Sequence, residues 1–252
     1  MKKTIHTIHG INGSTAVIKS NNCRVKDIFL NNTGRAYKDE NLNKIISKKS
    51  LNNQIKNFSS LNNFKFDSNR TQGIVVTFEF FGIKDTIDSF FEESKDHNCI
   101  LILDQLEDPQ NLGQIIRTSE CAGVNKIILT QNRSVKLSDS VLQVSQGAFC
   151  DISFYICNNL RNTIKILKEE DYWLVALENS IKAQNWYEID LKGNIGIILG
   201  SEGKGVRKLT LEDSDFKATI PMQGTTNSLN VSAACSAILF ERLRQISIGL
   251  NS

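Results

Sequence analysis

The feature that most constrains the fold is a regular alternation of short apolar runs and amphipathic segments from residue 99 onward. The apolar runs are CILILDQL, KIILT, ISFYI, YWLVALE and IGIILG. Continuously apolar runs of this length are typical of strands that are covered on both faces. The first helix pattern begins with Asp108 as N-cap and Pro109 at the first helical position, and it ends at Gly123. This alternation predicts an α/β fold with one parallel, doubly covered sheet.

Three polar, glycine-containing loops follow apolar strands in this part of the chain. They read EDPQNLGQIIRTSE after CILILDQL, SEGKGVRK after IGIILG, and PMQGTTNSLNVS after KATI. Ligands of open parallel sheets bind beyond the carboxyl ends of the strands. Core packing does not explain three such loops, so we expect them to form a binding site together.

The stretch from Thr219 to Gln245 joins the last loop to a long helix. Pro221 ends the strand before it, because proline has no N–H to donate to a sheet. Ser228 is expected to cap a helix that begins at Leu229. This helix is apolar on more than one face, so it is either a capped core helix or shared with a second subunit. We predict a symmetric homodimer with the helix at or beside the interface.

The residues before position 99 have a different pattern. Residues 1–77 are interpreted as a small α/β domain, residues 78–98 as a linker with a surface helix around Ile87, Phe90 and Phe91, and residues 99–252 as the sheet domain. Within the first domain the expected elements are strands over Val25–Leu30 and Gly73–Phe78 and a helix over Asn41–Phe58.

Charge is unevenly distributed between these parts, although the whole chain carries only +3. Residues 1–70 hold 13 lysines and arginines against 4 acidic residues, a net charge of +9. The remaining 182 residues hold 17 against 23, a net charge of −6. A basic part joined to a mildly acidic part indicates a nucleic-acid-binding module beside a different activity. Alternatively, the lysine count is high only because the composition has drifted toward asparagine and lysine, with no relation to binding.

Composition argues against several classes of protein. The chain has no run of about 18 apolar residues, as a transmembrane helix requires, and its start lacks the apolar core of a secretory signal. We therefore expect a cytoplasmic protein that has no membrane partner. The six cysteines form no C-x-x-C pair, and the three histidines lie far from the polar loops. This pattern favours reduced thiols and argues against a metal site or a histidine-based triad.

The three loops together resemble the motifs of the SpoU (TrmH) family of RNA ribose 2′-O-methyltransferases, within the SPOUT superfamily. The matching segments are Asp108–Gly113 with Arg117 and Thr118, Leu199–Gly205, and Ile220–Met222 with Ser228–Ser232. The resemblance covers roughly Leu101 to Gln245. The N-terminal part resembles the family's substrate-binding domain through Ile8–Ile11 and Gln72–Ile74. It departs from that domain at Thr71, where a histidine is common, and in residues 10–15, which are slightly expanded.

The resemblance implies a deep trefoil knot in the C-terminal sheet, formed by the second and third motifs. It also implies that the backbone of this knot binds S-adenosylmethionine in a bent form. The implied cofactor contacts are Gly200, Ile220, Met222 and Leu229. The candidate catalytic residues at matching motif positions are Arg117, Asn111, Glu202, Ser228 and Asn230. Within the family, the closest likeness is to the branch that methylates a guanosine ribose in 23S ribosomal RNA.

The residue types suit this chemistry independently. Methyl transfer to a ribose hydroxyl is an in-line displacement, so the protein must align donor and acceptor and stabilise the developing alkoxide. Gly200, Gly203 and Gly205 allow backbone groups to approach an adenine closely. The resemblance suggests Arg117 as the general base. A guanidinium does not give up its proton in proteins, so a milder role is to grip the adjacent phosphate and stabilise the alkoxide.

Each candidate also has a purely structural alternative. Glu202 either bonds Asn111, orients Arg117 or is a solvated loop carboxylate. Asn111 is otherwise an ordinary first-turn residue, and Ser228 and Asn230 are otherwise only helix caps. The alternative for Arg117 is a surface arginine paired with Glu120 one turn later.

The sequence therefore predicts an S-adenosylmethionine-dependent RNA ribose 2′-O-methyltransferase. Ribosomal RNA is the expected substrate, because the tRNA branch of the family carries terminal helical extensions instead of a basic N-terminal domain. The rival from another class is a non-enzymatic RNA-binding or ribosome-assembly protein on the same fold, which a loss of Arg117 or Asn230 would have favoured. A nucleotide-dependent oxidoreductase is disfavoured, because the fingerprint glycines are absent after the first strand.

Overall fold

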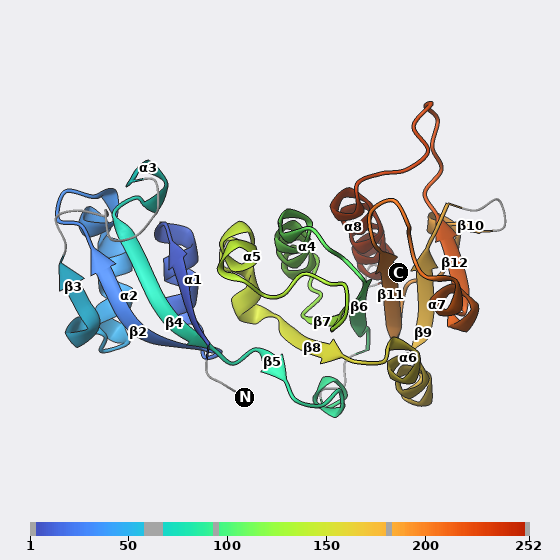
Figure 1. Cartoon of the computed structure of the whole chain (residues 1–252), viewed down its shortest axis with the longest axis horizontal. Helices are drawn as coiled ribbons and strands as arrows, with labels where there is room; N and C mark the ends of the chain where they lie inside the picture. The colour runs from blue at the N-terminus through green and yellow to red at the C-terminus, as the bar shows by residue number, and fades with distance from the viewer. Residues whose placement is uncertain (1–3, 58–67, 93–95, 180–182, 250–252) are drawn as a thin grey trace. The chain divides into compact units, whose positions relative to one another are not determined.

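The computed structural model describes residues 4–57, 68–92, 96–179 and 183–249. The chain divides into two compact units (Figure 1). The first comprises the residues up to Gly82 together with Leu137–Asp151, and the second comprises Ile83–Lys136 and the residues from Ile152 onward.

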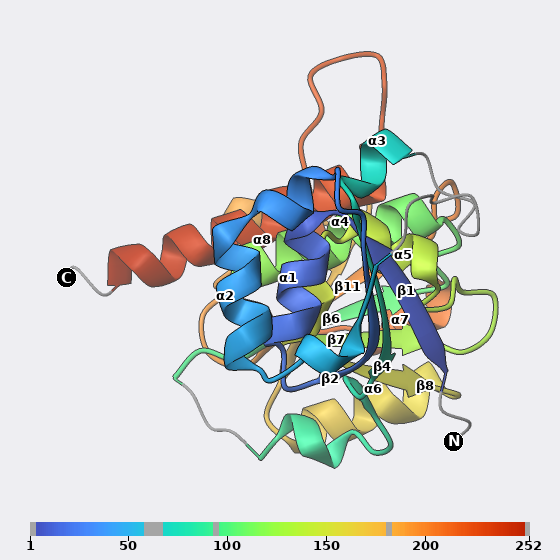
Figure 2. The same cartoon turned by 90° about the vertical axis from the view of Figure 1, so that its left-hand side faces the viewer.

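The first unit is built on a four-stranded sheet with the order β1-β4-β2-β3. Its strands are β1 (Ile5–His9), β2 (Cys23–Leu30), β3 (Ile55–Asn57) and β4 (Ile74–Phe80), and its N-terminal helices are α1 (Ile11–Lys19), α2 (Glu40–Lys48) and the single turn α3 (Ser68–Thr71). Strand β4 pairs antiparallel with both β1 and β2, while β3 runs parallel to β2. Helices α1 and α2 pack side by side (Figure 2). Asp39 starts α2, because its carboxylate accepts a hydrogen bond from the Leu42 N–H at 2.9 Å.

Residues 137–151 belong to the first unit, which corrects the expectation that they form part of the sheet domain. They contain the helix α5 (Asp139–Val144). His6 Nδ1 lies 2.8 Å from Asp139 Oδ1, and the His9 N–H donates to Gln143 Oε1 at 2.9 Å. The ring of Phe149 stacks on Phe78 at 5.7 Å between centroids. These partners lie far away in sequence, so no local pattern indicated the pairing.

The second unit contains an eight-stranded sheet with the order β10-β12-β9-β11-β6-β7-β8-β5. The strands are β5 (Ile83–Lys84), β6 (Cys99–Asp104), β7 (Lys126–Thr130), β8 (Ser153–Cys157), β9 (Trp173–Leu177), β10 (Gln184–Asn185), β11 (Ile195–Gly200) and β12 (Phe216–Thr219). Every neighbouring pair is parallel, which confirms the predicted sheet type.

Four helices accompany this sheet: α4 (Pro109–Cys121), α6 (Leu160–Glu169), α7 (Lys208–Asp213) and α8 (Val231–Gly249). Helices α4 and α8 pack on each other on one side of the sheet, and α6 lies on the other (Figure 1). All six residues of β6 are buried. Burial raises the pKa of the Cys99 thiol in β6 to about 11, so this thiol stays protonated near neutral pH.

Residues 78–98 differ from the predicted linker and surface helix. Strand β4 continues to Phe80, and β5 joins the sheet beside β8. A single 3-10 turn over Asp88–Phe90 replaces the helix, and Ile87 and Phe90 are buried in the core instead of covering a surface. The predicted helix over Asn41–Phe58 is also shorter, because the chain turns after α2 and enters β3.

The described helices include none that is both long and apolar enough to cross a membrane.

Candidate active site at the carboxyl ends of the strands

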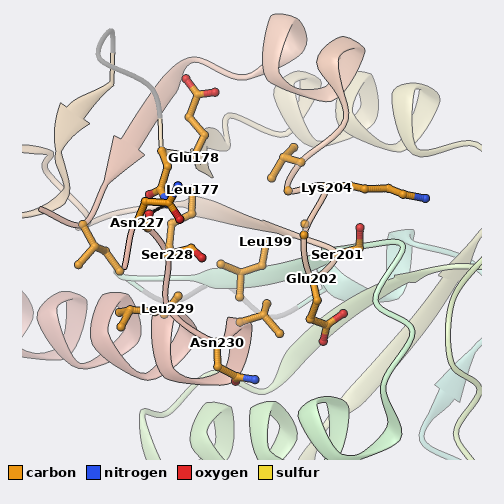
Figure 3. A pocket seen from close by; sticks show the side chains of 18 of the residues that line it. Leu177, Glu178, Leu199, Ser201, Glu202, Lys204, Asn227, Ser228, Leu229 and Asn230 are labelled. Atoms are coloured by element: carbon orange, nitrogen blue, oxygen red, sulfur yellow. Dashed lines mark hydrogen bonds between the residues drawn. The ribbon is translucent and has the colours of Figure 1, made fainter. Parts of the chain in front are cut away.

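A cavity of about 660 Å³ lies at the carboxyl ends of β9, β11 and β12 (Figure 3). The segments that line it come from the end of β9 at Leu177–Asn179, from the loop after β11 and from the loop after β12. All four predicted cofactor-binding residues line it, namely Gly200, Ile220, Met222 and Leu229. Of the predicted catalytic residues, Glu202, Ser228 and Asn230 line it as well.

The loop after β11 folds back tightly on the end of its own strand. Gly205 donates its N–H to the carbonyl of Ser201 at 2.9 Å, and both Gly203 and Gly205 have positive φ angles. A Cβ atom at Gly200 would lie only 2.0 Å from the carbonyl carbon of Gly205. The loop therefore requires glycine at position 200 for close backbone contact, and at positions 203 and 205 for conformation.

A chain of hydrogen bonds links the three motifs beside the cavity. The amide of Asn111, in the first turn of α4, donates to Glu202 Oε1 in the loop after β11. The Asn230 amide donates in turn to Asn111 Oδ1 at 3.0 Å. The side chain of Asn111 is buried, with 5% exposure, so these bonds satisfy an amide that would otherwise be costly to bury. Of the alternatives for Glu202, the bond to Asn111 is the one that forms.

Asn230, not Ser228, caps the long helix. Asn230 Oδ1 accepts from the Ser232 N–H at 2.9 Å, and α8 begins at Val231, two residues later than predicted. Both residues are of cap-forming types, so the sequence alone did not distinguish them. Ser228 is exposed and lines the cavity (Figure 3). Ser232 also donates to Gln114 Oε1 at 3.0 Å, which ties α8 to α4.

Arg117 lies on α4 about 9 Å along the helix axis from Asn111, at about 1.5 Å rise per residue. Its side chain is exposed and does not line the cavity. It forms no ion pair with Glu120 or with any other residue that the structure describes, so the expected alternative of a surface pair does not occur.

Two features of the site had no clear signal in the sequence. The first is the wall formed by Leu177, Glu178 and Asn179, which carries no glycine or polar motif. The second is the buried carboxylate of Asp104 at the end of β6. It accepts from Arg207 Nε at 2.8 Å and from the Thr210 hydroxyl at 3.1 Å, which fastens the chain just after the glycine loop. These partners are more than 100 residues apart in the chain.

The cavity has the size, shape and polarity of a site for a nucleoside cofactor. Its volume falls within the range of about 300–1,000 Å³ typical of small-molecule pockets. Apolar side chains such as Leu199, Ile220 and Leu229 alternate with backbone groups of the two loops, and Glu178 and Glu202 provide negative charge. Figure 3 shows Glu178 and Asn227 on one side of the pocket and Ser201 and Lys204 on the opposite side. Among the described residues, no group of three or more histidine, cysteine or acidic side chains is arranged to hold a metal ion.

Comparisons with known proteins agree with this geometry. The SpoU rRNA Methylase family matches residues 98–240. The 23S rRNA (guanosine-2'-O-)-methyltransferase RlmB of Ralstonia nicotianae is 34% identical over 181 residues, 72% of each chain. A TrmH family tRNA/rRNA methyltransferase of Staphylococcus saprophyticus is 41% identical over 161 residues, which span 63% of this chain and 64% of that protein.

The fold is also found in a solved structure. The SpoU methyltransferase AviRb of Streptomyces viridochromogenes, in complex with AdoMet, superposes with a TM-score of 0.80 at 16% identity and covers 97% of this chain and 92% of its own. The trefoil knot expected from the motifs is implied by this fold family. Two of the three motifs line one cavity, and the first is bonded to both of them through Asn111. The SpoU model matches more than half of the sequence, which places the chain in the SpoU rRNA methylase family.

Proposed function

We propose that this chain transfers the methyl group of S-adenosylmethionine to the ribose 2′-hydroxyl of a guanosine in 23S ribosomal RNA. Its family membership makes it an S-adenosylmethionine-dependent RNA methyltransferase. Relatives named 23S rRNA (guanosine-2'-O-)-methyltransferase RlmB support the choice of RNA and of base. The observation that carries the proposal is that the second and third motifs line one cavity of the second unit and that Asn111 of the first motif bonds to both of them.

Gly200, Ile220, Met222 and Leu229 are proposed to hold the cofactor. Ile220 and Leu229 supply apolar surface for an adenine, and the absence of a side chain at Gly200 lets the backbone of the two loops close around it. The cofactor supplies a methyl group on a positively charged sulfur. The carboxylates of Glu178 and Glu202 suit that charge, because opposite charges attract strongly at a partly desolvated site.

The catalytic roles are proposed from the hydrogen bonds. Asn111 and Asn230 keep Glu202 in place at the edge of the cavity, so these two amides position the loop after β11. The Ser228 hydroxyl is exposed at the cavity and is available to the ribose. Arg117 is proposed to bind the phosphate beside the target ribose and to stabilise the alkoxide as it forms.

Cofactor binding is the first expected result. Titration calorimetry with S-adenosylmethionine, or with its demethylated product, is expected to show one site per chain, because the second and third motifs line one cavity. Glu202→Gln is expected to weaken cofactor binding less than Gly200→Ala does, since the glutamine side chain keeps a carbonyl oxygen that accepts the hydrogen bond from Asn111. If folded protein shows no heat of binding, the proposed methyltransferase function is contradicted.

The RNA substrate is tested by mapping 2′-O-methyl positions in total RNA from cells with and without the gene. The expected result is one lost guanosine methylation in 23S rRNA. A lost mark in tRNA would instead favour the wider description of the Staphylococcus relative. If the methylation map is unchanged but ribosome assembly is defective without the gene, the result would support the rival, a non-enzymatic assembly protein. Because the RNA is ribosomal, we also propose that the protein acts in the cytoplasm.

A homodimer built on α8 is proposed from the surface of this helix. Phe240 and Ile248 are 47% and 55% exposed in the single chain, and Leu229 just before the helix is 44% exposed. Apolar side chains of this size gain free energy when a second copy covers them. Arg117 does not reach the cavity of its own chain, which fits an active site completed between two subunits.

Light scattering at micromolar concentration is expected to give twice the chain mass of 28.3 kDa. Phe240→Asp is expected to shift the protein toward monomers, because it places a charge in the proposed interface. Tyr187→Asp, at a side chain that is 52% exposed outside α8, is the control and should leave the dimer intact. A wild-type monomer at this concentration would argue against the dimer.

The first unit is proposed to bind the RNA. Its sequence holds most of the excess positive charge of the chain, and electrostatic attraction to phosphates is the main source of affinity for nucleic acid. Residues 137–151 pack into this unit, so deleting residues 1–77 would expose their apolar side chains. Substitutions in the full chain are therefore the cleaner test of this role.

A further inference from the structure

The first unit gathers cations without acidic partners at one end of its sheet. Arg35 and Lys38, on a 3-10 turn over Arg35–Lys38, and Arg70, on α3, are exposed and form no ion pair with any described residue. Elsewhere in the unit four cations are paired: Arg24 and Lys26 with Glu79, Lys44 with Glu40, and Lys56 with Asp27. Lys19, Lys48 and Lys49 are also exposed and form no ion pair with a described residue. Arg35, Lys38 and Arg70 differ from those three lysines because the two segments that carry them are in backbone contact.

The loops that carry these cations are fixed to one another through Gln72. Its side-chain oxygen accepts from the Ile11 N–H at 2.8 Å, and its main-chain oxygen accepts from the Ala36 N–H at 2.9 Å. Gln72 has a φ of +52°, an unusual conformation for a residue other than glycine. A Cβ atom at Gly34 would lie 2.6 Å from the Cα of Gly73, so the two loops touch backbone to backbone.

This arrangement forms a rigid platform around an exposed aromatic side chain. Tyr37 is 48% exposed, while its neighbour Ala36 is fully buried and anchors the turn. The two acidic side chains that follow Tyr37 in the sequence are already engaged, since Asp39 caps α2 and Glu40 pairs with Lys44. An exposed aromatic ring on a segment with exposed cations suits a nucleotide that is not base-paired. Its base can stack on the ring while its phosphates bind the cations.

We propose that Tyr37, Arg35, Lys38 and Arg70 form a binding surface for an unpaired stretch of the substrate RNA, with one base stacked on Tyr37. The inference deepens the proposed function, because it takes the ligand to be RNA. A protein partner is disfavoured, since interface cores are depleted of charged side chains and the two segments at this ring carry three exposed cations.

The stacking contact is tested with Tyr37→Ala and Tyr37→Trp in the full chain. Binding is measured by filter retention of in vitro transcribed 23S rRNA and by anisotropy of a fluorescein-labelled single-stranded 20-nucleotide RNA. Tyr37→Ala is expected to lower affinity at least about fivefold, the lower end of what a stacked base contributes, whereas Tyr37→Trp keeps it. Tyr187→Ala is the control for an exposed tyrosine elsewhere and should bind as wild type does.

The charges are tested by the salt dependence of binding to the same single-stranded RNA. The combined variant Arg35→Ala, Lys38→Ala and Arg70→Ala is expected to reduce the slope of log affinity against log salt by about 2, at roughly 0.7 per phosphate contact on a single strand. Lys19→Ala with Lys48→Ala is the matched control. These lysines stand in the last turns of α1 and α2, where they complement the helix dipole.

The outcomes separate this inference from the proposed function. If wild-type protein methylates 23S rRNA but Tyr37→Ala binds within twofold and the slope is unchanged, the surface assignment is wrong and the function stands. An equal loss with duplex RNA would overturn the stacking contact, because paired bases are not available to Tyr37. If wild-type protein neither binds nor methylates rRNA, the proposed function itself fails.

Discussion

Arg117→Ala is expected to abolish methyl transfer while leaving affinity for S-adenosylmethionine nearly unchanged. Arg117 is exposed on α4 and lies outside the cavity that the cofactor is proposed to fill, so its removal opens no hole in that pocket. It is also free of ion pairs within the described chain, so no buried acid is left without a partner. A loss of turnover would therefore report a contact with RNA or with the reacting oxygen.

Arg117→Lys distinguishes the effect of the planar guanidinium geometry from the effect of its positive charge. Lysine keeps the charge but loses the planar group that binds two phosphate oxygens at once. We expect little rescue, with a loss of order 100-fold if about 3 kcal/mol of transition-state stabilisation disappears. Single-turnover methylation on 23S rRNA measures the chemical step. The same measurement separates both proposed roles from a passive surface position.

The control for this pair is Arg161→Ala. Arg161 is an exposed arginine on α6, paired with Asp213 and covering the other side of the sheet from α4. Its removal is expected to cost at most a surface ion pair, which is worth about 0–1 kcal/mol of stability, and to leave the rate unchanged. Near wild-type turnover by Arg117→Ala would end the claim that Arg117 is catalytic.

The sequence predicted the elements whose structure depends on neighbouring residues, such as helix starts and buried strands. The start of α4 combines a capping aspartate with a proline at the first helical position, and the Asp108 side chain indeed accepts from Gln110 N–H at 2.9 Å. The apolar runs from Cys99 to Gly200 became parallel strands, because a run covered on both faces has no polar side to show. The gathering of the motif loops also followed from strand ends sharing one edge of a sheet.

Contacts between distant residues could not be predicted in this way. The Asp104–Arg207 pair and the packing of Phe149 on Phe78 each join segments separated by tens of residues, and neither leaves a local trace. The predicted cap of α8 was wrong for another reason. Ser228 and Asn230 are both good caps, and the choice was decided by the bond between Asn230 and Asn111 across two motifs.

Gly200→Ala is expected to destroy the cofactor site. The added Cβ would lie 2.0 Å from the carbonyl carbon of Gly205 and 2.1 Å from the amide nitrogen of Val206. Both are backbone atoms, so no side chain can turn away, and the loop after β11 must move as a whole. That loop carries Glu202 and is held on its far side by the pair of Arg207 with the buried carboxylate of Asp104. Strain therefore falls on the segment that closes around the proposed cofactor.

The expected result is at least about a 100-fold loss of S-adenosylmethionine affinity, together with a loss of stability of roughly 1–3 kcal/mol, as overpacking typically causes. Calorimetric titration and thermal unfolding measure the two effects. Gly224→Ala is the matched control in the loop after β12, because a Cβ there meets open space and the φ of Gly224 is not in the left-handed region. It should change stability by no more than about 0.5 kcal/mol.

Gly203→Ala distinguishes conformation from crowding. Its Cβ meets nothing within 4 Å, but its φ of +78° is unfavourable for alanine. It is expected to cost about 1–2 kcal/mol of stability through the backbone alone and to bind the cofactor more tightly than Gly200→Ala does. Close backbone contact between Gly200 and Gly205 is what the site depends on. Cofactor binding by Gly200→Ala within threefold of wild type would show that this contact is not required.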